Sequence, residues 1–297
     1  MRMANSSRWF MSLVLCGAAV GLAQTPDPSR KALADLLARV NSNWKANGIL
    51  TEQYTSDEIY HNRNFDKKGK TVEDETAKYE NVFVEGLPYR RKVEENGKPL
   101  SEKTAAAEEK RFNQAVEERR KMSLEEKRRG LHFGFHSSLP ICCLLTLFDN
   151  RIVRHETVNG RDAAVVESVP KPNAKPANKD EETSLGWKET TWIDAEESVP
   201  ARIEVELLED RGHMSKGMTI RMDFVRLIDT PASDGQPERS VWLQSDSISH
   251  LQFKVMWYEV SGITEQTWSN FKKFHVDMRL LEDSVQEVPG QQVDRPQ

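Results

Sequence analysis

The chain has 297 residues, of which 42 are Lys or Arg and 47 are Asp or Glu, giving a formal net charge of −5. This mildly acidic balance argues against a nucleic-acid partner, because nucleic-acid-binding proteins carry a basic patch or stripe. The length suits one large domain or two small ones. Three cysteines are too few for a disulfide framework, so the fold has to rest on its hydrophobic core.

The N-terminus has the layout of a secretory signal. Arg2 and Arg8 give a basic start, an uncharged apolar run follows, and Gly21 and Ala23 are small residues where a signal peptidase cleaves. The run is shorter than the ~20 residues of a membrane span, and no later segment is apolar enough for a stable span. Residues 1–23 are therefore predicted to be a cleaved signal peptide that directs the protein to the periplasm or outside the cell. A buried N-terminal helix and an uncleaved anchor are the alternatives.

The first half of the mature chain is predicted to combine helices with a few strands. Apolar residues from Leu33 to Trp44 recur at helical spacing, which predicts a helix over 28–47 with Gly48 as its stop. Strand-like segments follow, and 66–78 is charged and contains glycine, as in an exposed hairpin tip. Residues 101–129 form a charged helical block with few apolar positions, which predicts a solvated outer helix. A short, very apolar helix is expected over 138–148.

The second half has the pattern of antiparallel strands. Asn159-Gly160 lies between two strand-like runs and is the strongest hairpin signal in the chain. An exposed loop is expected at 170–184. Further strands are expected at 185–195, 200–209, 215–229, 239–247, 250–260 and 263–279. Their apolar and polar residues alternate, so each strand should have one apolar and one wet face. The tail 283–297 is polar.

So many one-sided strands with few helices predict an α+β, mainly β fold. The sheet should be a curved antiparallel one that forms an open half-barrel covered by α-helices. Incomplete cover would leave an apolar cavity for a lipid-sized ligand, and the alternative is that the same side chains simply form the core. The residues expected to line the cavity are Trp192, Ile203, Val205, Ile220, Met222, Phe224, Phe253, Val255, Trp257 and Phe274.

The order of these features resembles the outer-membrane lipoprotein-sorting family, the LolA/LolB-like half-barrel proteins of the periplasm. The resemblance is carried by the signal and first helix, by 148–170 with its Asn-Gly turn, by Thr191-Trp192-Ile193-Asp194 with Pro200 to Glu204, and by 268–276. It implies a single half-barrel domain over 24–282 with a charged helical insertion near 101–129. It also implies a carrier that ferries lipid or an acylated protein. The family's gating arginine has no matched position in this chain.

The sequence contains no strong catalytic motif. There is no phosphate-binding loop and no Gly-x-Ser-x-Gly turn. His132 and His136 with Cys142 and Cys143 could suggest zinc, but Gly134 and Pro140 weaken any helix that would align them. No metal, no cofactor and no enzymatic activity are expected. The chain is predicted to carry lipid or acyl chains. The alternatives are an envelope interaction or signalling module that binds a protein, and a secreted hydrolase.

Overall fold

The computed structural model describes residues 28–127, 145–231, 237–255 and 258–274. The helices and strands bounded within these residues are α1 (Pro28–Thr51), β1 (Tyr54–Phe65), β2 (Thr71–Val84), β3 (Leu87–Glu95), β4 (Lys98–Pro99), α2 (Glu102–Arg120), β5 (Phe148–Val158), β6 (Arg161–Pro170), α4 (Lys179–Ser184), β7 (Trp187–Asp194), β8 (Pro200–Leu207), β9 (Thr219–Thr230), β10 (Arg239–Val255) and β11 (Tyr258–Lys273).

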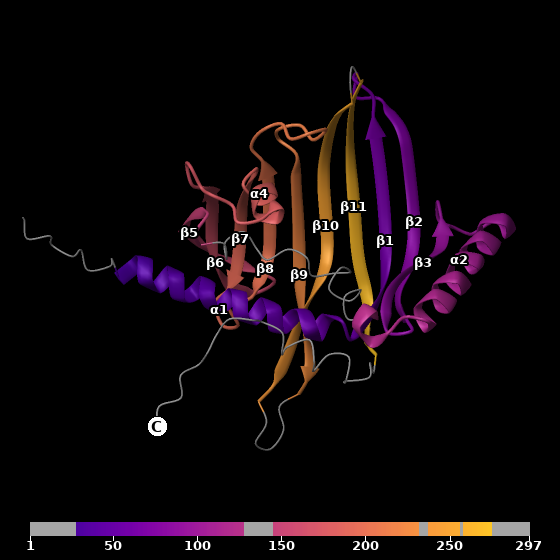
Figure 1. Ribbon diagram of the computed structural model, residues 1–297, viewed down its shortest axis with the longest axis horizontal. Helices are drawn as coiled ribbons and strands as arrows, with labels where there is room; N and C mark the ends of the chain where they lie inside the picture. The colour runs from indigo at the N-terminus through magenta and orange to yellow at the C-terminus, as the bar shows by residue number, and fades with distance from the viewer. Residues whose placement is uncertain (1–27, 128–144, 232–236, 256–257, 275–297) are drawn as a thin grey trace, which may run out of the picture.

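All of these strands belong to one antiparallel sheet in the order β4-β3-β2-β1-β11-β10-β9-β8-β7-β6-β5. The sheet is open, because β4 and β5 at its two ends are not paired with each other, and it is visibly curved and twisted (Figure 1). The prediction of a mainly β fold with an open antiparallel sheet and a few helices is confirmed.

Helix α1 crosses the strands near one end and supplies the apolar stripe that buries the core there (Figure 1). Its Leu37 and Val40 are almost fully buried against Val166 and Ile193. The helix runs to Thr51, so the predicted stop at Gly48 is wrong. Tertiary contact explains the extension, because Asn47, one residue before the glycine, is held against β10.

Asn47 occupies a gap in the sheet. β10 pairs with β11 only from Asp246 onward, so the backbone of Trp242 lacks a strand on that side. The Asn47 side chain takes the place of that strand: its amide donates to the Trp242 carbonyl (2.8 Å), and its oxygen accepts from the Trp242 N–H (2.7 Å). These two hydrogen bonds fix the C-terminal part of α1 to β10 before the chain enters β1.

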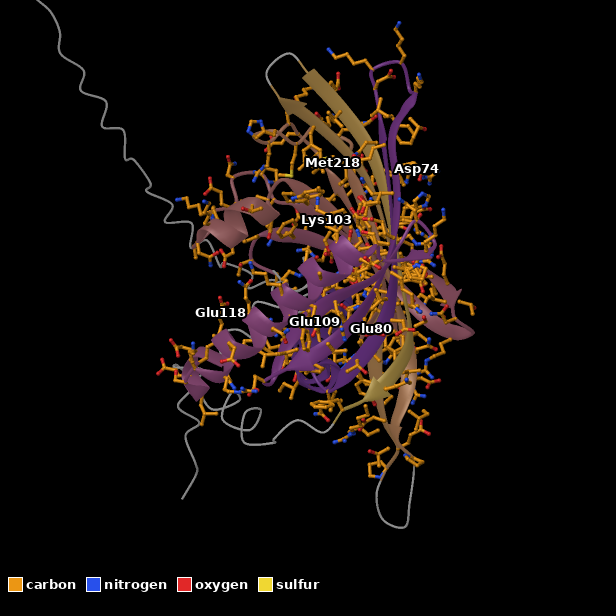
Figure 2. The ribbon with its side chains drawn as sticks, turned by 90° about the vertical axis from the view of Figure 1, so that its right-hand side faces the viewer. Asp74, Glu80, Lys103, Glu109, Glu118 and Met218 are labelled. Atoms are coloured by element: carbon orange, nitrogen blue, oxygen red, sulfur yellow. The ribbon has the colours of Figure 1, made fainter. Side chains whose placement is uncertain are left out.

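Helix α2 covers the other end of the sheet, where β4 leaves most of the edge of β3 unpaired. Arg119 donates to the carbonyls of Leu87 (2.9 Å) and Pro88 (2.8 Å), and Arg111 donates to the carbonyl of Arg90 (2.8 Å). The helix has no buried residue, as predicted for the charged block. Figure 2 shows α2 with Lys103, Glu109 and Glu118 along its length.

The hairpin prediction at Asn159-Gly160 is confirmed, since both residues have positive φ between β5 and β6. Several boundaries were wrong. The exposed tip expected over 66–78 ends earlier, because β2 begins at Thr71 and pairs with β1. Phe148 starts a strand rather than ending a helix, because it pairs with Pro170.

Further along the chain, the expected strand 239–247 and residues 250–255 of the next expected strand form one strand, β10, whereas residues 258–260 begin β11. The predicted loop 170–184 contains the short helix α4. The predicted signal 1–23, residues 138–144 of the apolar helix, and the tail 283–297 lie outside the described residues.

Candidate functional site

The register of the sheet sorts side chains onto two faces, since directly paired residues share a face. One continuous row of partners runs from Val166 through Thr191 and Ile203 to Met222, and then through Ser247 to Gln266 on β11. Val166 is a contact of α1. We call the side that carries this row the α1 face, and the other side the opposite face.

The four central strands, β8 to β11, differ sharply between these faces. Their α1 face holds a group of uncharged residues that we call the uncharged panel. The panel comprises Ile203 and Val205 on β8, Ile220, Met222 and Phe224 on β9, Ser247, Ser249, Leu251 and Phe253 on β10, and Gly262, Thr264 and Gln266 on β11.

On the same strands the opposite face is charged. It carries Arg202, Glu204 and Glu206 on β8, Arg221 and Asp223 on β9, Asp246, His250 and Lys254 on β10, and Glu259 and Glu265 on β11. Arg202 pairs with Asp223 across the strands at 2.5 Å. In a chain with 30% charged residues, the absence of charge from the panel is a marked asymmetry. Water solvates the opposite face, whereas the panel is suited to contact with something uncharged.

Only part of the panel is covered by described residues. At the end where α1 crosses, Trp44 packs edge-on against Phe224 with ring centroids 5.1 Å apart, and both Phe224 and Ile203 are buried. Away from that end, Ile220, Leu251 and Phe253 are only half-buried. Large apolar side chains are therefore partly accessible on an uncharged surface.

Six of the ten residues predicted to line a cavity lie together in the panel: Ile203, Val205, Ile220, Met222, Phe224 and Phe253. Trp192 does not, because its cross-strand partners are Val165 and Arg202. It points to the opposite face, where its indole N–H donates to Glu156. Phe274 lies beyond β11, 45% exposed and stacked on Phe83. The side chain of Val255 and all of Trp257 lie outside the described residues.

The sequence did not reveal a polar cluster that borders the panel on the α1 face. Glu58 is 2% exposed and accepts two hydrogen bonds from Arg90 (2.8 and 2.7 Å), one from Gln266 (2.9 Å) and one from Asn81 (3.2 Å). Burial alone would raise the pKa of Glu58, but the bonds from Arg90, Gln266 and Asn81 outweigh it and lower the pKa. The Arg90 guanidinium also stacks 3.4 Å above the centre of the Tyr79 ring.

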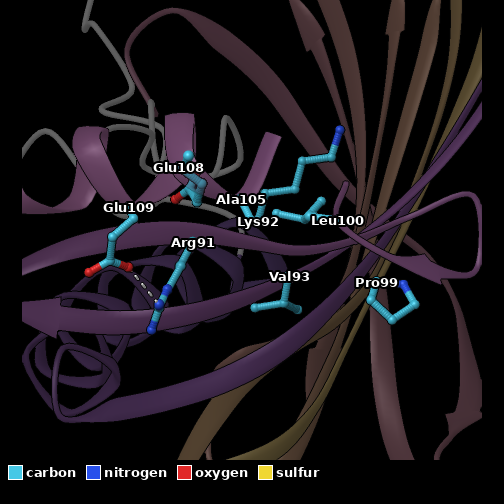
Figure 3. A pocket seen from close by; sticks show the side chains of 9 residues that line it. Arg91, Lys92, Val93, Pro99, Leu100, Ala105, Glu108 and Glu109 are labelled. Carbon is cyan, nitrogen blue, oxygen red and sulfur yellow. Dashed lines mark hydrogen bonds and ion pairs between the residues drawn. The ribbon is translucent and has the colours of Figure 1, made fainter. Parts of the chain in front are cut away.

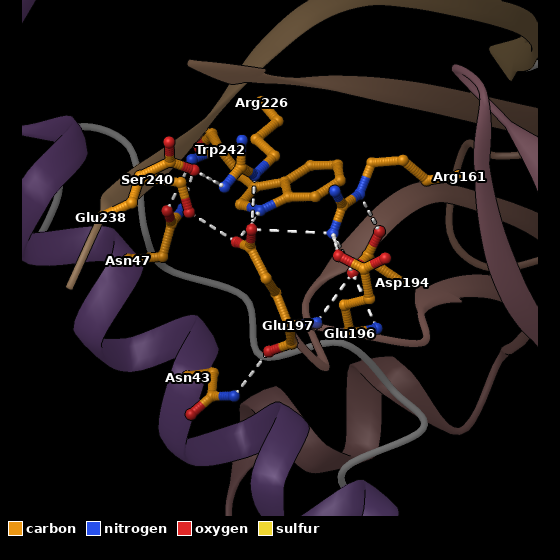
Figure 4. A network of polar contacts seen from close by, with 10 residues as sticks. All are labelled: Asn43, Asn47, Arg161, Asp194, Glu196, Glu197, Arg226, Glu238, Ser240 and Trp242. Atoms are coloured by element: carbon orange, nitrogen blue, oxygen red, sulfur yellow. Dashed lines mark hydrogen bonds and ion pairs between the residues drawn. The ribbon is translucent and has the colours of Figure 1, made fainter. Parts of the chain in front are cut away.

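A second polar network fastens α1 over the panel's covered end (Figure 4). The Glu197 carboxylate accepts from the Ser240 hydroxyl (2.5 Å), the Trp242 indole (2.8 Å) and the Arg226 guanidinium, while its backbone carbonyl accepts from Asn43 of α1 (2.7 Å). Burial opposes ionisation of Glu197, yet the bonds from these three side chains lower its pKa. The turn after β7 thus joins α1, β9 and β10.

The same turn is anchored to the β5–β6 hairpin. Asp194 is 1% exposed, and Arg161 binds both of its oxygens at 2.5 and 3.0 Å. Arg161 also reaches Glu196 at 2.9 Å, and its guanidinium lies 5.9 Å from the Trp242 ring centre. Every charge in this network has a partner, so we assign it to holding the fold together rather than to binding a ligand.

Two grooves lie elsewhere on the described surface. One, of about 510 Å³, runs between β3 and the start of α2, where Val93, Leu100 and Ala105 form its apolar part and Arg91 pairs with Glu109 at its rim (Figure 3). The other, of about 480 Å³, is floored by residues 204–206 and 219–221, which include Val205 and Ile220 of the panel, and is bordered by Lys188, Thr190, Ile248 and His250. It lies along the charged opposite face.

The described residues contain no group of three His, Cys, Asp or Glu side chains placed to hold a metal ion. His132, His136, Cys142 and Cys143, which suggested the zinc alternative, lie outside them. Within the same part of the chain, no helix is both long and apolar enough to cross a membrane.

No protein family model matches the chain, and no curated protein matches it in sequence. Among solved structures it is similar to a domain from Vibrio parahaemolyticus described as an outer membrane lipoprotein-sorting protein (13% identity, 86% of this chain and 98% of that one, TM-score 0.32). It is also similar to a DUF1329 family protein from Desulfovibrio piger (14%, 87% and 99%, 0.31) and to a LolA superfamily protein from Nitrosomonas europaea (10%, 84% and 97%, 0.25).

Proposed function

We propose that this protein is a non-enzymatic carrier of the cell envelope that holds a lipid or acyl chain against the uncharged panel. The observation that supports the proposal is the absence of charge from the panel, beyond which Arg226 on the same face of β9 is paired with Glu197, combined with the partial exposure of Ile220, Leu251 and Phe253. Burying an alkyl chain gains ~0.8 kcal/mol per methylene. A long chain can therefore be held without any ionic contact.

The cellular location is part of the proposal. A cleaved signal over 1–23 would place the mature protein in the periplasm or outside the cell, with lipids and acylated envelope proteins as its partners. Sequencing the N-terminus of exported protein tests this, and the expected start is close to Gln24 or Thr25. Retention in the cytoplasm with Met1 intact would contradict it.

The binding test compares two isoleucines that lie on adjacent strands and point to different faces. Ile220 belongs to the panel and pairs with Ser249, whereas Ile248 pairs with Arg221 on the opposite face, and both side chains are half-buried. The probe is N-phenylnaphthylamine, an uncharged dye whose fluorescence rises in apolar surroundings. Ile220→Lys should weaken its binding at least about tenfold, because a lysine ammonium would have to lose its water. Ile248→Lys should leave it unchanged.

Circular dichroism confirms in each case that the variant is folded. Wild-type protein that takes up neither the dye nor a co-purifying lipid would overturn the carrier proposal. An envelope module that binds a protein partner would then be the better description.

A further inference from the structure

Two adjacent rows of the uncharged panel change in composition in the same way across the strands. One row of cross-strand partners runs Ile203, Met222, Ser247, Gln266 and Tyr60, ending on β1. It begins with apolar side chains, passes through a hydroxyl and an amide, and ends on a phenol. With strands ~4.8 Å apart, the distance from Met222 to Tyr60 is roughly 14 Å.

The neighbouring row repeats the change. Its members are Val205, Ile220, Ser249, Thr264 and Asn62, so β8 and β9 are again apolar while β10, β11 and β1 are polar. These two adjacent rows thus change from apolar to polar at the same line, between β9 and β10, whereas the rows beyond Ser249 hold apolar residues of β10 and β11 on the same face, namely Leu251, Phe253 and Val260. A ligand lying across these rows would meet an apolar surface at one end and hydrogen-bonding groups at the other.

The polar half keeps unused hydrogen-bonding capacity. The Thr264 hydroxyl donates to Asn62 (3.0 Å), and the Gln266 side-chain amide donates one hydrogen bond to Glu58 (2.9 Å). The hydroxyls of Ser247 and Ser249 form no hydrogen bond with another described residue, and each hydroxyl can both donate and accept. Groups that can do both suit a partner that is itself rich in hydroxyls.

The same half offers no unpaired charge. Arg90 and Glu58, the first ions met beyond the panel, neutralise each other at 2.7 Å. Lys92, next on β3, lies between Glu75 (3.2 Å) and Glu95 (2.5 Å). A charged headgroup seated here would lose hydration without gaining a counter-ion, which is costly at a half-buried site.

Aromatic rings complete the polar end. Tyr60 and Tyr79 meet edge to face with centroids 6.4 Å apart on the α1 face. Rings of this kind combine a flat apolar surface with a polar tip. Arg90 covers one face of Tyr79, and the parts of both rings that it leaves uncovered match a sugar ring with its C–H faces and hydroxyl rim.

From these observations we infer that the ligand is an amphiphile with an uncharged, hydroxyl-rich headgroup, such as a glycolipid. Within these two rows its acyl part lies on β8 and β9, and its headgroup lies on Ser247 and Ser249 of β10, on Thr264 and Gln266 of β11, and on β1. The inference rests on the proposed carrier function and deepens it by naming the headgroup chemistry.

The test uses three amphiphiles that share one dodecyl chain and differ in headgroup: dodecyl maltoside, dodecyl sulfate and dodecyltrimethylammonium. Each competes below its micelle concentration with N-phenylnaphthylamine for the wild-type protein. Because the chains are identical, any difference reports the headgroup. The maltoside should displace the dye at a concentration at least about tenfold lower than either charged amphiphile, since removing an unpaired charge from water costs more than removing a hydroxyl.

Two threonines on β11 provide a matched pair of variants. Thr264 belongs to the panel, whereas Thr267 points to the opposite face and donates to Asp246. Thr264→Val and Ser249→Ala should each weaken maltoside competition about fivefold, the value of one hydrogen bond, and leave dodecyl sulfate unchanged. Thr267→Val should change neither.

The outcomes separate the two proposals. Equal competition by all three amphiphiles, tightest binding of the sulfate or the ammonium, or a maltoside preference untouched by Thr264→Val would overturn the headgroup inference and leave the carrier function standing. Failure of the wild-type protein to bind the dye and every amphiphile would overturn the carrier function, and the headgroup inference with it.

Discussion

Glu52 directly follows α1, and burial raises the pKa of its carboxyl from 4.5 to about 7. The folded protein therefore holds a proton that the unfolded chain has released between these two values. Stability should fall as the pH rises through that window, and a constant penalty should remain above it. We predict that Glu52→Gln, which stays neutral, raises the free energy of unfolding by about 1–2 kcal/mol at about pH 8, a value reduced for partial exposure.

Near pH 4.5, the ordinary carboxyl pKa, the same variant should differ little from wild type. Urea unfolding at both pH values measures the effect. Glu118→Gln on the exposed side of α2 is the control and should show no such pH dependence. A gain of equal size at both pH values would mean that charge is not the cause.

Glu58 shows the opposite behaviour, since its pKa is lowered. Its contribution to stability is present above the ordinary carboxyl pKa and is lost as the pH falls below it. Glu58→Gln leaves Arg90 without its counter-charge and should cost about 2–3 kcal/mol, below the usual range for a fully buried pair because Arg90 is partly exposed. Chemical denaturation at neutral pH checks this. The control is Glu80→Gln, paired with Arg91 on the opposite face, which should change stability by less than about 0.5 kcal/mol.

For single residues such as Glu58, the sequence does not predict which side chains will surround them. Glu58 is one carboxylate among many, and only the register of β1 with β11 and β2 brings Gln266, Asn81 and Arg90 around it. Half of the panel could be predicted, because Ile220, Met222 and Phe224 alternate with polar residues. Trp192 was predicted to line a cavity from its residue type alone, and its face is set by the pairing of β7 with β6 and β8, which no local pattern records.

Among the secondary-structure elements, helix α2 covers the unpaired edge of β3. An unpaired strand edge is a template for association with another chain, and Arg119 occupies the edge carbonyls of Leu87 and Pro88. We predict that Arg119→Ala costs about 1–2 kcal/mol, because it leaves these edge carbonyls without their charged donor. It should also speed hydrogen exchange in β3. Exchange measured by mass spectrometry tests this, with Arg120→Ala as control because that side chain is 60% exposed.

Unchanged exchange in β3 of Arg119→Ala would show that the aromatic contact between Phe112 and Tyr89, with centroids 5.3 Å apart, suffices to hold α2.

Elements set by local rules were predictable, such as the Asn159-Gly160 hairpin, where both residues need positive φ. The sequence predicted two strands in place of β10, because Ser247, Ser249 and His250 weaken the alternation of apolar and polar residues there. Pairing with β9 and β11 on either side keeps it continuous.

For the whole molecule, the uncharged panel exists only when four strands are in register, so a ligand bound there stabilises the folded state alone. At a concentration about a hundredfold above the dissociation constant this linkage is worth about 2.7 kcal/mol. For a domain of this size each kcal/mol raises Tm by about 2–4 °C. We therefore predict that dodecyl maltoside, kept below its micelle concentration, raises Tm by about 5–10 °C in a calorimetric scan. Ile220→Lys should abolish the shift and Ile248→Lys should keep it. A shift that persists in Ile220→Lys would place the ligand away from the panel, whereas loss of the shift in both variants would implicate the folded state as a whole.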